Sequence, residues 1–203
     1  MIRIAVLDYG IGNLRSAEKA LQHVGAAARL VTDPAEVEAA DAVVLPGVGA
    51  FGACARALRD SGLHAAAQAA IAAGVPFLAV CVGFQLLYEG SDESPGAVGL
   101  GVFAGQSALL APTEKHPQMQ WNQLESVGQP DPAPLRGLGE RPWVYFVHSY
   151  APPIGAETVA VCDYGGPVAA LVAEGNVWGA QFHPEKSGRS GLALLANFVA
   201  LAA

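Results

Sequence analysis

Short apolar runs alternate with helical patterns through the first half of the chain. The runs over 2–7, 28–31, 41–45 and 75–81 have strand length and lack the apolar-polar alternation of a sheet with one wet face. Strands of this kind are buried on both faces, as in a parallel sheet covered by helices. The regular succession of strand and helix segments predicts an α/β fold with a doubly wound, mostly parallel sheet. Its ligand crevice is expected at the carboxyl ends of the strands.

Helix signals fill the gaps between these runs. The spacing predicts a helix from Ala17 to Val24, one that begins at Asp33-Pro34, and two more over 53–58 and 63–73. Cys54 lies in the third of these, where we interpret it as a core residue.

The second half of the chain has a different texture, in which β-type runs are separated by Pro and Gly turns. We interpret these runs as antiparallel additions to the sheet, with a loop over 128–142 and a last helix over 191–201. Since no repeat and no linker interrupts residues 1–203, we expect a single domain. The predicted additions are 102–110, 123–127, 144–149, 159–163, 168–173 and 177–182.

The charge balance excludes some classes of partner. The chain has 203 residues and a formal net charge of -7, with 11 basic residues scattered among 18 acidic ones. A nucleic-acid or anionic-lipid surface needs clustered positive charge, so neither is expected. The N-terminal apolar run is too short for a signal peptide, and Gly, Pro or charge interrupts every apolar stretch before it reaches membrane-spanning length.

Three cysteines are present, and their spacing matches neither a metal site nor a disulfide framework. We therefore expect no metal, and a reducing, cytoplasmic compartment.

One of these cysteines ends an apolar strand. Cys81 closes the run over 75–81, and Gly83 follows two residues later at the start of what we interpret as an amphipathic helix. This is the outline of a nucleophile elbow, in which a sharp turn from strand to helix holds the nucleophile above the sheet. The alternative is a buried structural cysteine, because free Cys often behaves as a small hydrophobe.

Two glycine-containing loops also follow predicted strands. In 46–49, Gly47 and Gly49 come directly after a buried strand, where backbone must approach a ligand closely or adopt a positive φ. Gly10 and Gly12 suggest a dinucleotide fingerprint, but Arg15 stands where the third glycine is needed, which argues against it.

A nucleophilic thiol needs a base and a group that orients the base. Of five histidines, His183 stands at a strand's carboxyl end and is followed by Pro184 and Glu185. A carboxylate so close can hold one ring nitrogen while the other faces Cys81. The alternative is a surface His-Glu contact. His148 ends another apolar strand, which is compatible with the core or with a site.

These motifs resemble those of a known family. The 46–47 segment, the Cys81 elbow and the Gln-Phe-His-Pro-Glu segment over 181–185 are similar to those of the class I glutamine amidotransferases. Four segments, 8–14, 46–51, 145–150 and 181–187, are similar to the branch that provides the glutaminase subunits of imidazole glycerol phosphate synthase in histidine biosynthesis. The resemblance covers nearly the whole chain.

The resemblance implies a function and a site. Cys81 would be the nucleophile that forms a γ-glutamyl thioester with L-glutamine and releases ammonia, His183 the base and Glu185 the group that orients it. No cofactor is implied. The oxyanion would be held by Val82 and by Gly47, Val48 and Gly49, and the amino-acid end of glutamine by Gln85 and the main chain of His148, Ser149 and Tyr150.

The resemblance also implies a partner, the (β/α)₈ cyclase subunit of imidazole glycerol phosphate synthase. The glycines of the 46–49 loop would let a peptide there rotate, so we expect weak activity alone and a rise when the partner is loaded. Departures from the family pattern over 115–122 affect the expected interface. The positions that match partner-facing ones are Asn13, Met119, Trp121, Asn122, Tyr145 and Lys186.

Three alternatives stay open at this point. One is a glutaminase subunit of another ammonia-using synthase, to which the Gly-Val-Gly over 47–49 and the His-Ser-Tyr over 148–150 are less similar. The others are a non-catalytic scaffold of the same fold and a cysteine hydrolase or peptidase.

Overall fold

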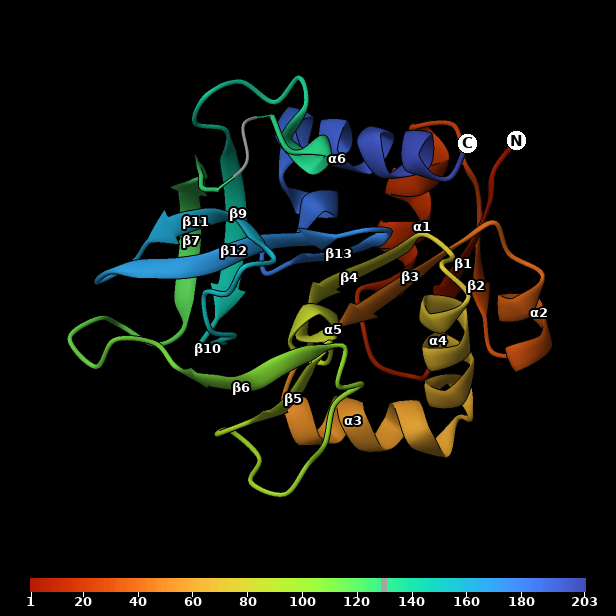
Figure 1. The fold of residues 1–203 in the computed structure, drawn as a ribbon, viewed down its shortest axis with the longest axis horizontal. Coiled ribbons are helices and arrows are strands. Elements are labelled where there is room, and N and C mark those ends of the chain that lie inside the picture. Colours follow the sequence, from red (N-terminus) through yellow and green to blue (C-terminus); the bar gives the residue numbers. More distant parts are fainter. Residues whose placement is uncertain (129–130) are drawn as a thin grey trace.

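The central feature of the fold is an eight-stranded sheet. A computed structural model describes residues 1–128 and 131–203 (Figure 1). Five neighbouring strands of this sheet are parallel and the remaining three are antiparallel, so the predicted fold class is confirmed. In spatial order the strands are β2 (Ala27–Val31), β1 (Arg3–Leu7), β3 (Ala42–Gly47), β4 (Phe77–Cys81), β13 (Val177–Ala180), β12 (Pro167–Glu174), β11 (Thr158–Asp163) and β8 (Glu125–Ser126).

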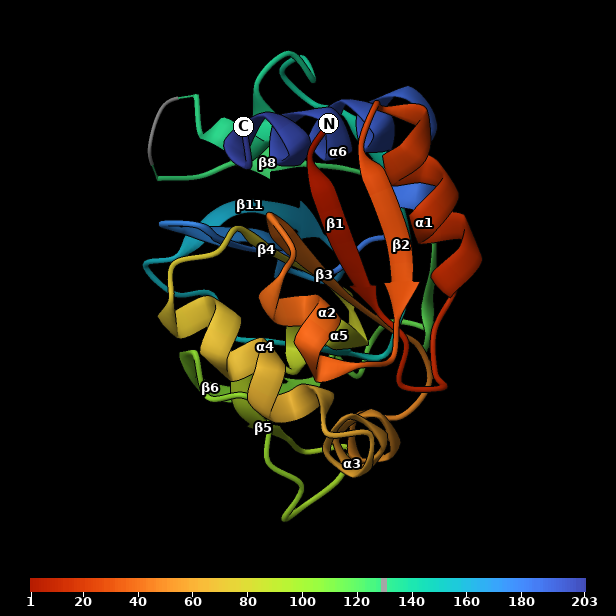
Figure 2. The same ribbon diagram turned by 90° about the vertical axis from the view of Figure 1, so that its right-hand side faces the viewer.

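Helices cover both faces of the parallel part (Figures 1 and 2). α1 (Leu14–His23) and α6 (Gly188–Leu201) pack on one face and contact each other. α2 (Pro34–Glu38), α3 (Phe51–Asp60) and α4 (Leu63–Ala72) lie on the other. The start of α2 is fixed by its cap, since the Asp33 carboxylate accepts a hydrogen bond from the Ala35 N–H at 2.9 Å.

The core explains why the sheet forms where it does. Every residue of β3 and β4 is buried, which is what strands without polar alternation require. Burial of one large aliphatic side chain stabilises the fold by about 1.5 to 3 kcal/mol, and Leu7, Leu45 and Leu78 are fully enclosed. Among residues 1–128 and 131–203, no helix is long and apolar enough to cross a membrane.

The second half of the chain differs from the sequence prediction in its pairing. The run over 177–182 was expected to be antiparallel, but β13 pairs in parallel with β4. The run over 102–110 was expected to extend the central sheet, but β6 (Phe103–Leu109) lies in a separate three-stranded sheet with β5 (Tyr88–Ser91) and β10 (Tyr150–Ala151). Sequence period alone cannot say which strand pairs with which.

A two-stranded ribbon forms a separate sheet that contacts β11 and α6 (Figure 1). It pairs β9 (Trp143–His148), which was predicted as a strand of the central sheet, with β7 (Gln118–Gln123), which was not predicted. The predicted loop over 128–142 contains one 3₁₀ turn, η1 (Ala133–Leu135), and residues 129–130 of that prediction lie outside the described residues.

A helix follows Cys81 as predicted, but it is not amphipathic, because all four of its residues are buried. α5 (Val82–Gln85) has only four residues, after which the chain enters β5. Leu86, Leu87 and Tyr88 are all buried, so the segment that follows α5 has no solvent face for a long surface helix.

Candidate active site

Cys81 occupies a strained backbone position at the carboxyl end of β4. It has φ 56° and ψ -112°, which is uncommon for a residue other than glycine. A Cβ at Gly83 would overlap the carbonyl oxygen of Leu45, so the turn tolerates only glycine there. Such strain costs about 1 to 3 kcal/mol and persists where the surrounding structure enforces it. The geometry is that of a nucleophile elbow.

His183 reaches the same edge of the sheet because β13 runs parallel to β4. The register pairs Ala180 with Val80, so the two strands end side by side at the same edge of the sheet. The His183 Nδ1 lies 2.9 Å from Glu185 Oε1, and both side chains are almost completely buried. The short turn η2 (Pro184–Lys186) places this carboxylate, which also accepts a hydrogen bond from the Asn13 amide at 3.2 Å.

The charges around His183 favour its protonated form. Burial alone lowers the pKa of His183, but the interactions with Cys81 and then Glu185 outweigh burial and raise it. Burial raises the pKa of Glu185, because it disfavours the charged carboxylate. The hydrogen bond from His183 outweighs burial, so the pKa of Glu185 is lowered. The sequence left open which ring nitrogen faces sulfur. Because Nδ1 is bound to Glu185 and Nε2 has no hydrogen-bond partner within the described chain, Nε2 is the nitrogen that can take a proton from Cys81.

A pocket of about 270 Å³ opens at this edge of the sheet. Cys81 lies in it, with its Sγ 3.9 Å from the carbonyl oxygen of Val147. Two of the predicted site residues, Gly47 and Glu185, lie instead in a small recess behind His183. The pocket brings together nine predicted residues, Val48, Gly49, Cys81, Val82, Gln85, His148, Ser149, Tyr150 and His183.

The predicted oxyanion loop adjoins the elbow directly. Gly47 is the register partner of Cys81 between β3 and β4. A Cβ on Gly47 would lie 2.7 Å from the Gly83 nitrogen, so the close approach of the two backbones needs glycine. Gly49 has φ +88°, a left-handed conformation that favours glycine. The backbone of this loop therefore lies against the nucleophile.

The buried amide of Gln85 ties the elbow to the His148–Tyr150 segment. Its Nε2 donates to the Tyr150 carbonyl at 2.8 Å and lies 3.2 Å from Gln181 Oε1. The His148 Nδ1 lies 2.9 Å from the same Tyr150 carbonyl, which fixes Nδ1 as the protonated nitrogen. Gln85 and His148 thus hold the segment that forms one wall of the pocket.

Sequence reasoning missed Glu93, which also lines the pocket. Its Oε2 accepts a hydrogen bond from the Phe51 N–H at 2.7 Å, at the first residue of α3. A carboxylate at a helix N-terminus is held by the backbone donors there. Glu93 lies in an irregular turn after β5, where no periodicity or motif marks it. Only the unpredicted path of β5 brings this acid to the pocket.

The six positions expected at a partner interface divide into four aromatic, Met or Lys side chains and two Asn side chains. On the ribbon, Trp121 pairs with Tyr145 at 6.1 Å between ring centroids, and Met119 and Trp121 are 61% and 49% exposed. Lys186 is exposed near Glu185. The amides of the other two are bound within the chain, Asn13 to Glu185 and Asn122 to the Asp163 carbonyl at 2.9 Å.

The buried imidazole of His148 predicts an acid-sensitive fold. Burial chiefly lowers the pKa of His148, from 6.5 to about 4. Below pH 6.5 His148 binds a proton in the unfolded chain but stays neutral in the folded chain. The free energy of unfolding therefore falls as the pH is lowered from 6.5 to about 4, by about 3 kcal/mol in all. In urea titrations between pH 7.5 and pH 4.5, His148→Gln should lose less stability than the wild type. Equal losses would contradict this.

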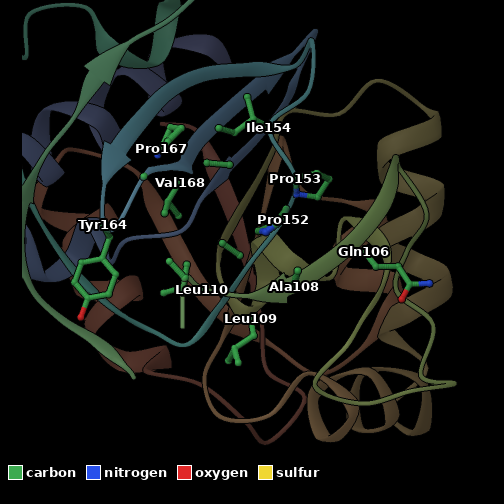
Figure 3. A pocket seen from close by; sticks show the side chains of 15 residues that line it. Gln106, Ala108, Leu109, Leu110, Pro152, Pro153, Ile154, Tyr164, Pro167 and Val168 are labelled. Atoms are coloured by element: carbon green, nitrogen blue, oxygen red, sulfur yellow. The ribbon is translucent and has the colours of Figure 1, made fainter. Parts of the chain in front are cut away.

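A second hollow, of about 320 Å³, is not lined by Cys81 and lies between β6, the segment after β10 and the turn that joins β11 to β12 (Figure 3). Proline and aliphatic side chains dominate its wall, and Tyr164 is the one ionisable side chain among its lining residues. It offers no nucleophile paired with a base. In the described part of the chain, no group of three His, Cys, Asp or Glu residues could hold a metal ion.

Comparisons with known proteins identify a matching family and similar sequences. Residues 5–202 match the family described as "Glutamine amidotransferase class-I". The chain is 49% identical over 199 residues to "Imidazole glycerol phosphate synthase subunit HisH" of Deinococcus radiodurans, covering 96% of this chain and 92% of the relative. The protein of the same name from Methanothermobacter thermautotrophicus is 47% identical, with 97% of each chain covered.

Solved structures share the fold at low sequence identity. One described as "Crystal structure of glutamine amidotransferase" has a TM-score of 0.77 at 23% identity, covering 98% of both chains. The glutaminase domain of Trypanosoma brucei CTPS with bound acivicin has a TM-score of 0.72 at 16% identity, covering 100% of this chain and 94% of that one. At these identities the likeness concerns the fold alone.

Proposed function

Because this chain belongs to the class I glutamine amidotransferase family, we propose that it hydrolyses L-glutamine to glutamate and ammonia by a Cys-His-Glu mechanism. It passes the ammonia to the cyclase subunit of imidazole glycerol phosphate synthase in histidine biosynthesis. The observation that carries the proposal is the strained Cys81 elbow, which shares a pocket with His183 while Glu185 binds the far ring nitrogen.

The chemistry follows from these positions. Cys81 Sγ attacks the carboxamide carbon as its proton passes to His183 Nε2, which gives a tetrahedral intermediate with an oxyanion. Collapse breaks the C–N bond, and His183 returns the proton to the leaving nitrogen, so ammonia departs and a γ-glutamyl thioester remains. His183 then removes a proton from water, which attacks the thioester, releasing glutamate and the Cys81 thiol.

The oxyanion needs donors at the elbow. The Val82 N–H follows the nucleophile directly, and the backbone of Val48 and Gly49 lines the same pocket. Each such donor lowers the barrier by about 3 kcal/mol. Since Gly47 permits more than one orientation of the peptide that joins it to Val48, the partner can complete this set of donors, which supports weak activity in the free subunit.

Glu93 gives the pocket a site for the α-ammonium group of glutamine. One of its oxygens is bound to the Phe51 N–H, and the side chain lines the pocket that holds Cys81. Glu93→Gln removes the negative charge, so KM for glutamine should rise about tenfold or more while kcat changes less, because an ion pair of this kind contributes roughly 1.5 to 3 kcal/mol. Steady-state ammonia release at varied glutamine measures both constants.

The matched control for Glu93 is its neighbour. Asp92 is exposed and does not line the pocket. Asp92→Asn changes the same charge by the same chemistry one residue away, so it should leave KM unchanged. An equal rise of KM in both variants would show a general effect of charge and contradict direct contact by Glu93.

The ribbon supplies the surface for the partner. One face of β7 and β9 carries an apolar and aromatic patch formed by Trp121, Met119 and Tyr145. The last two residues of β9, Val147 and His148, line the pocket. Aromatic residues and Met are enriched where partners bind. The relatives named as subunits of imidazole glycerol phosphate synthase support the existence of a partner subunit. The free thiols of the three cysteines support a cytoplasmic setting.

One experiment tests the whole proposal. Ammonia release from glutamine is measured for the chain alone, with the (β/α)₈ cyclase, and with cyclase plus its phosphorylated ribulosyl ligand. We expect weak release alone and a large rise in the full complex, together with labelling of Cys81 by an electrophilic glutamine analogue. Release that the cyclase does not change would point to another ammonia-using synthase, and no release in any mixture would contradict glutaminase activity.

A further inference from the structure

Two buried side chains outside the proposed triad donate hydrogen bonds to backbone carbonyls of the 46–49 loop. The first is Tyr9, which follows β1. Its hydroxyl donates a hydrogen bond to the Pro46 carbonyl at 2.6 Å, and its side chain is 6% exposed. The same hydroxyl oxygen would lie 2.9 Å from a Cβ on Gly47. Tyr9 therefore lies directly against the start of the loop.

The second side chain is Cys54, one turn into α3. Its thiol donates to the Val48 carbonyl at 3.3 Å, and the residue is fully buried. Burial chiefly raises the pKa of both Cys54 and Tyr9, so each remains a protonated donor at neutral pH. The two bonds come from different elements and end on carbonyls two residues apart.

These bonds restrict the loop in a specific way. In a trans peptide the C=O and the following N–H point in opposite directions. A Pro46 carbonyl bound to Tyr9 fixes the direction of the Gly47 N–H, and a Val48 carbonyl bound to Cys54 fixes the direction of the Gly49 N–H. Val48 and Gly49 line the pocket of Cys81. The two donors thus set where the flanking peptides of the loop stand relative to the nucleophile.

We propose that the Tyr9 hydroxyl and the Cys54 thiol are positioning residues for glutamine hydrolysis, which fix the carbonyls of Pro46 and Val48 and thereby align the loop amides with the oxyanion. The inference rests on the proposed function, because it assigns a role within the same site. Neither side chain lines the Cys81 pocket, so both act through the backbone that they bind.

The test compares Tyr9→Phe, Cys54→Ala and Cys54→Ser with wild type in the complex with the cyclase. Misalignment affects the transition state more than substrate binding, so Tyr9→Phe and Cys54→Ala should each lower kcat by about tenfold, with KM within about twofold. Cys54→Ser keeps a donor at the same place and should recover most of kcat. Cys162→Ala, which removes an equally buried thiol far from the loop, is the control.

A second measurement does not depend on activity. Amide hydrogen exchange of 46–50 should be about tenfold faster or more in Tyr9→Phe and Cys54→Ala than in wild type or Cys162→Ala, at matched thermal stability. Unchanged kcat in both variants would overturn the inference, and so would unchanged exchange in both. Should one variant fail to fold, the other decides alone.

The two hypotheses fail in different ways. A wild-type complex without glutamine hydrolysis would refute the proposed function and leave the exchange result standing. An active wild type whose Tyr9→Phe and Cys54→Ala variants match it in kcat would refute the positioning role alone.

Discussion

Cys81→Ala should lower kcat of the cyclase complex for glutamine hydrolysis by about 10⁴-fold or more, because the loss of one residue of a nucleophilic unit costs nearly as much as the loss of the whole unit. Neither of the other two cysteines can replace it, since the Cys54 thiol is bound to the Val48 carbonyl and Cys162 lies on β11. Ammonia release in the loaded complex measures the effect. Without the thiol no thioester forms, so labelling by an electrophilic glutamine analogue should vanish as well.

The control for Cys81→Ala is Cys162→Ala, which also removes a buried thiol and should keep wild-type kcat. Glutamine binding provides a further check. The pocket walls formed by Gln85, Glu93 and Tyr150 remain in place, so Cys81→Ala should bind glutamine with near wild-type affinity in calorimetry. Residual turnover within tenfold of wild type would contradict a role for Cys81 as nucleophile.

The parts of the site that the sequence predicted are those carried by contiguous segments. Cys81 with Gly83 and His183 with Glu185 each lie within a few residues, and each follows a strand that period and burial identify. Parallel strands end at one edge, which predicted that the 46–49 loop and Cys81 lie together. The strand before His183 was expected to be antiparallel, so the sequence placed His183 beside Cys81 by its motif alone, and the parallel pairing of β13 with β4 brings it there. Glycine at 47 was expected for a close approach to a ligand or a positive φ, but the structure requires it for the close approach of the Gly83 nitrogen.

The parts that sequence reasoning missed depend on pairing between distant segments. Glu93 reaches the pocket only because the chain turns into β5 after a four-residue α5. β7 has mixed polar composition and becomes a strand by pairing with β9. Cys54 was assigned to the core on its helical position, and its burial agrees with this. Its bond to the Val48 carbonyl depends on how α3 sits beneath the loop, which no local pattern encodes.

Glu185→Gln should lower kcat by about 10² to 10⁴-fold, because it reverses the hydrogen bond that sets the tautomer of His183. The carboxylate accepts from Nδ1–H and leaves Nε2 free to receive the thiol proton. A glutamine amide can instead donate to Nδ1, which places the proton on Nε2 and removes the base. KM for glutamine should change little, since Glu185 lies in the recess behind His183 and outside the substrate pocket.

The same variant has a signature that a merely structural role would not produce. Cys81 and Glu185 together raise the pKa of His183 against the effect of burial, so the loss of one carboxylate should lower that pKa, as measured by the imidazole resonance in a pH titration. Glu174→Gln, an exposed change of the same chemistry at the end of β12, should alter neither kcat nor the His183 titration. Glu185→Gln with wild-type kcat would show that the carboxylate does not orient the base, and the triad would reduce to Cys81 and His183.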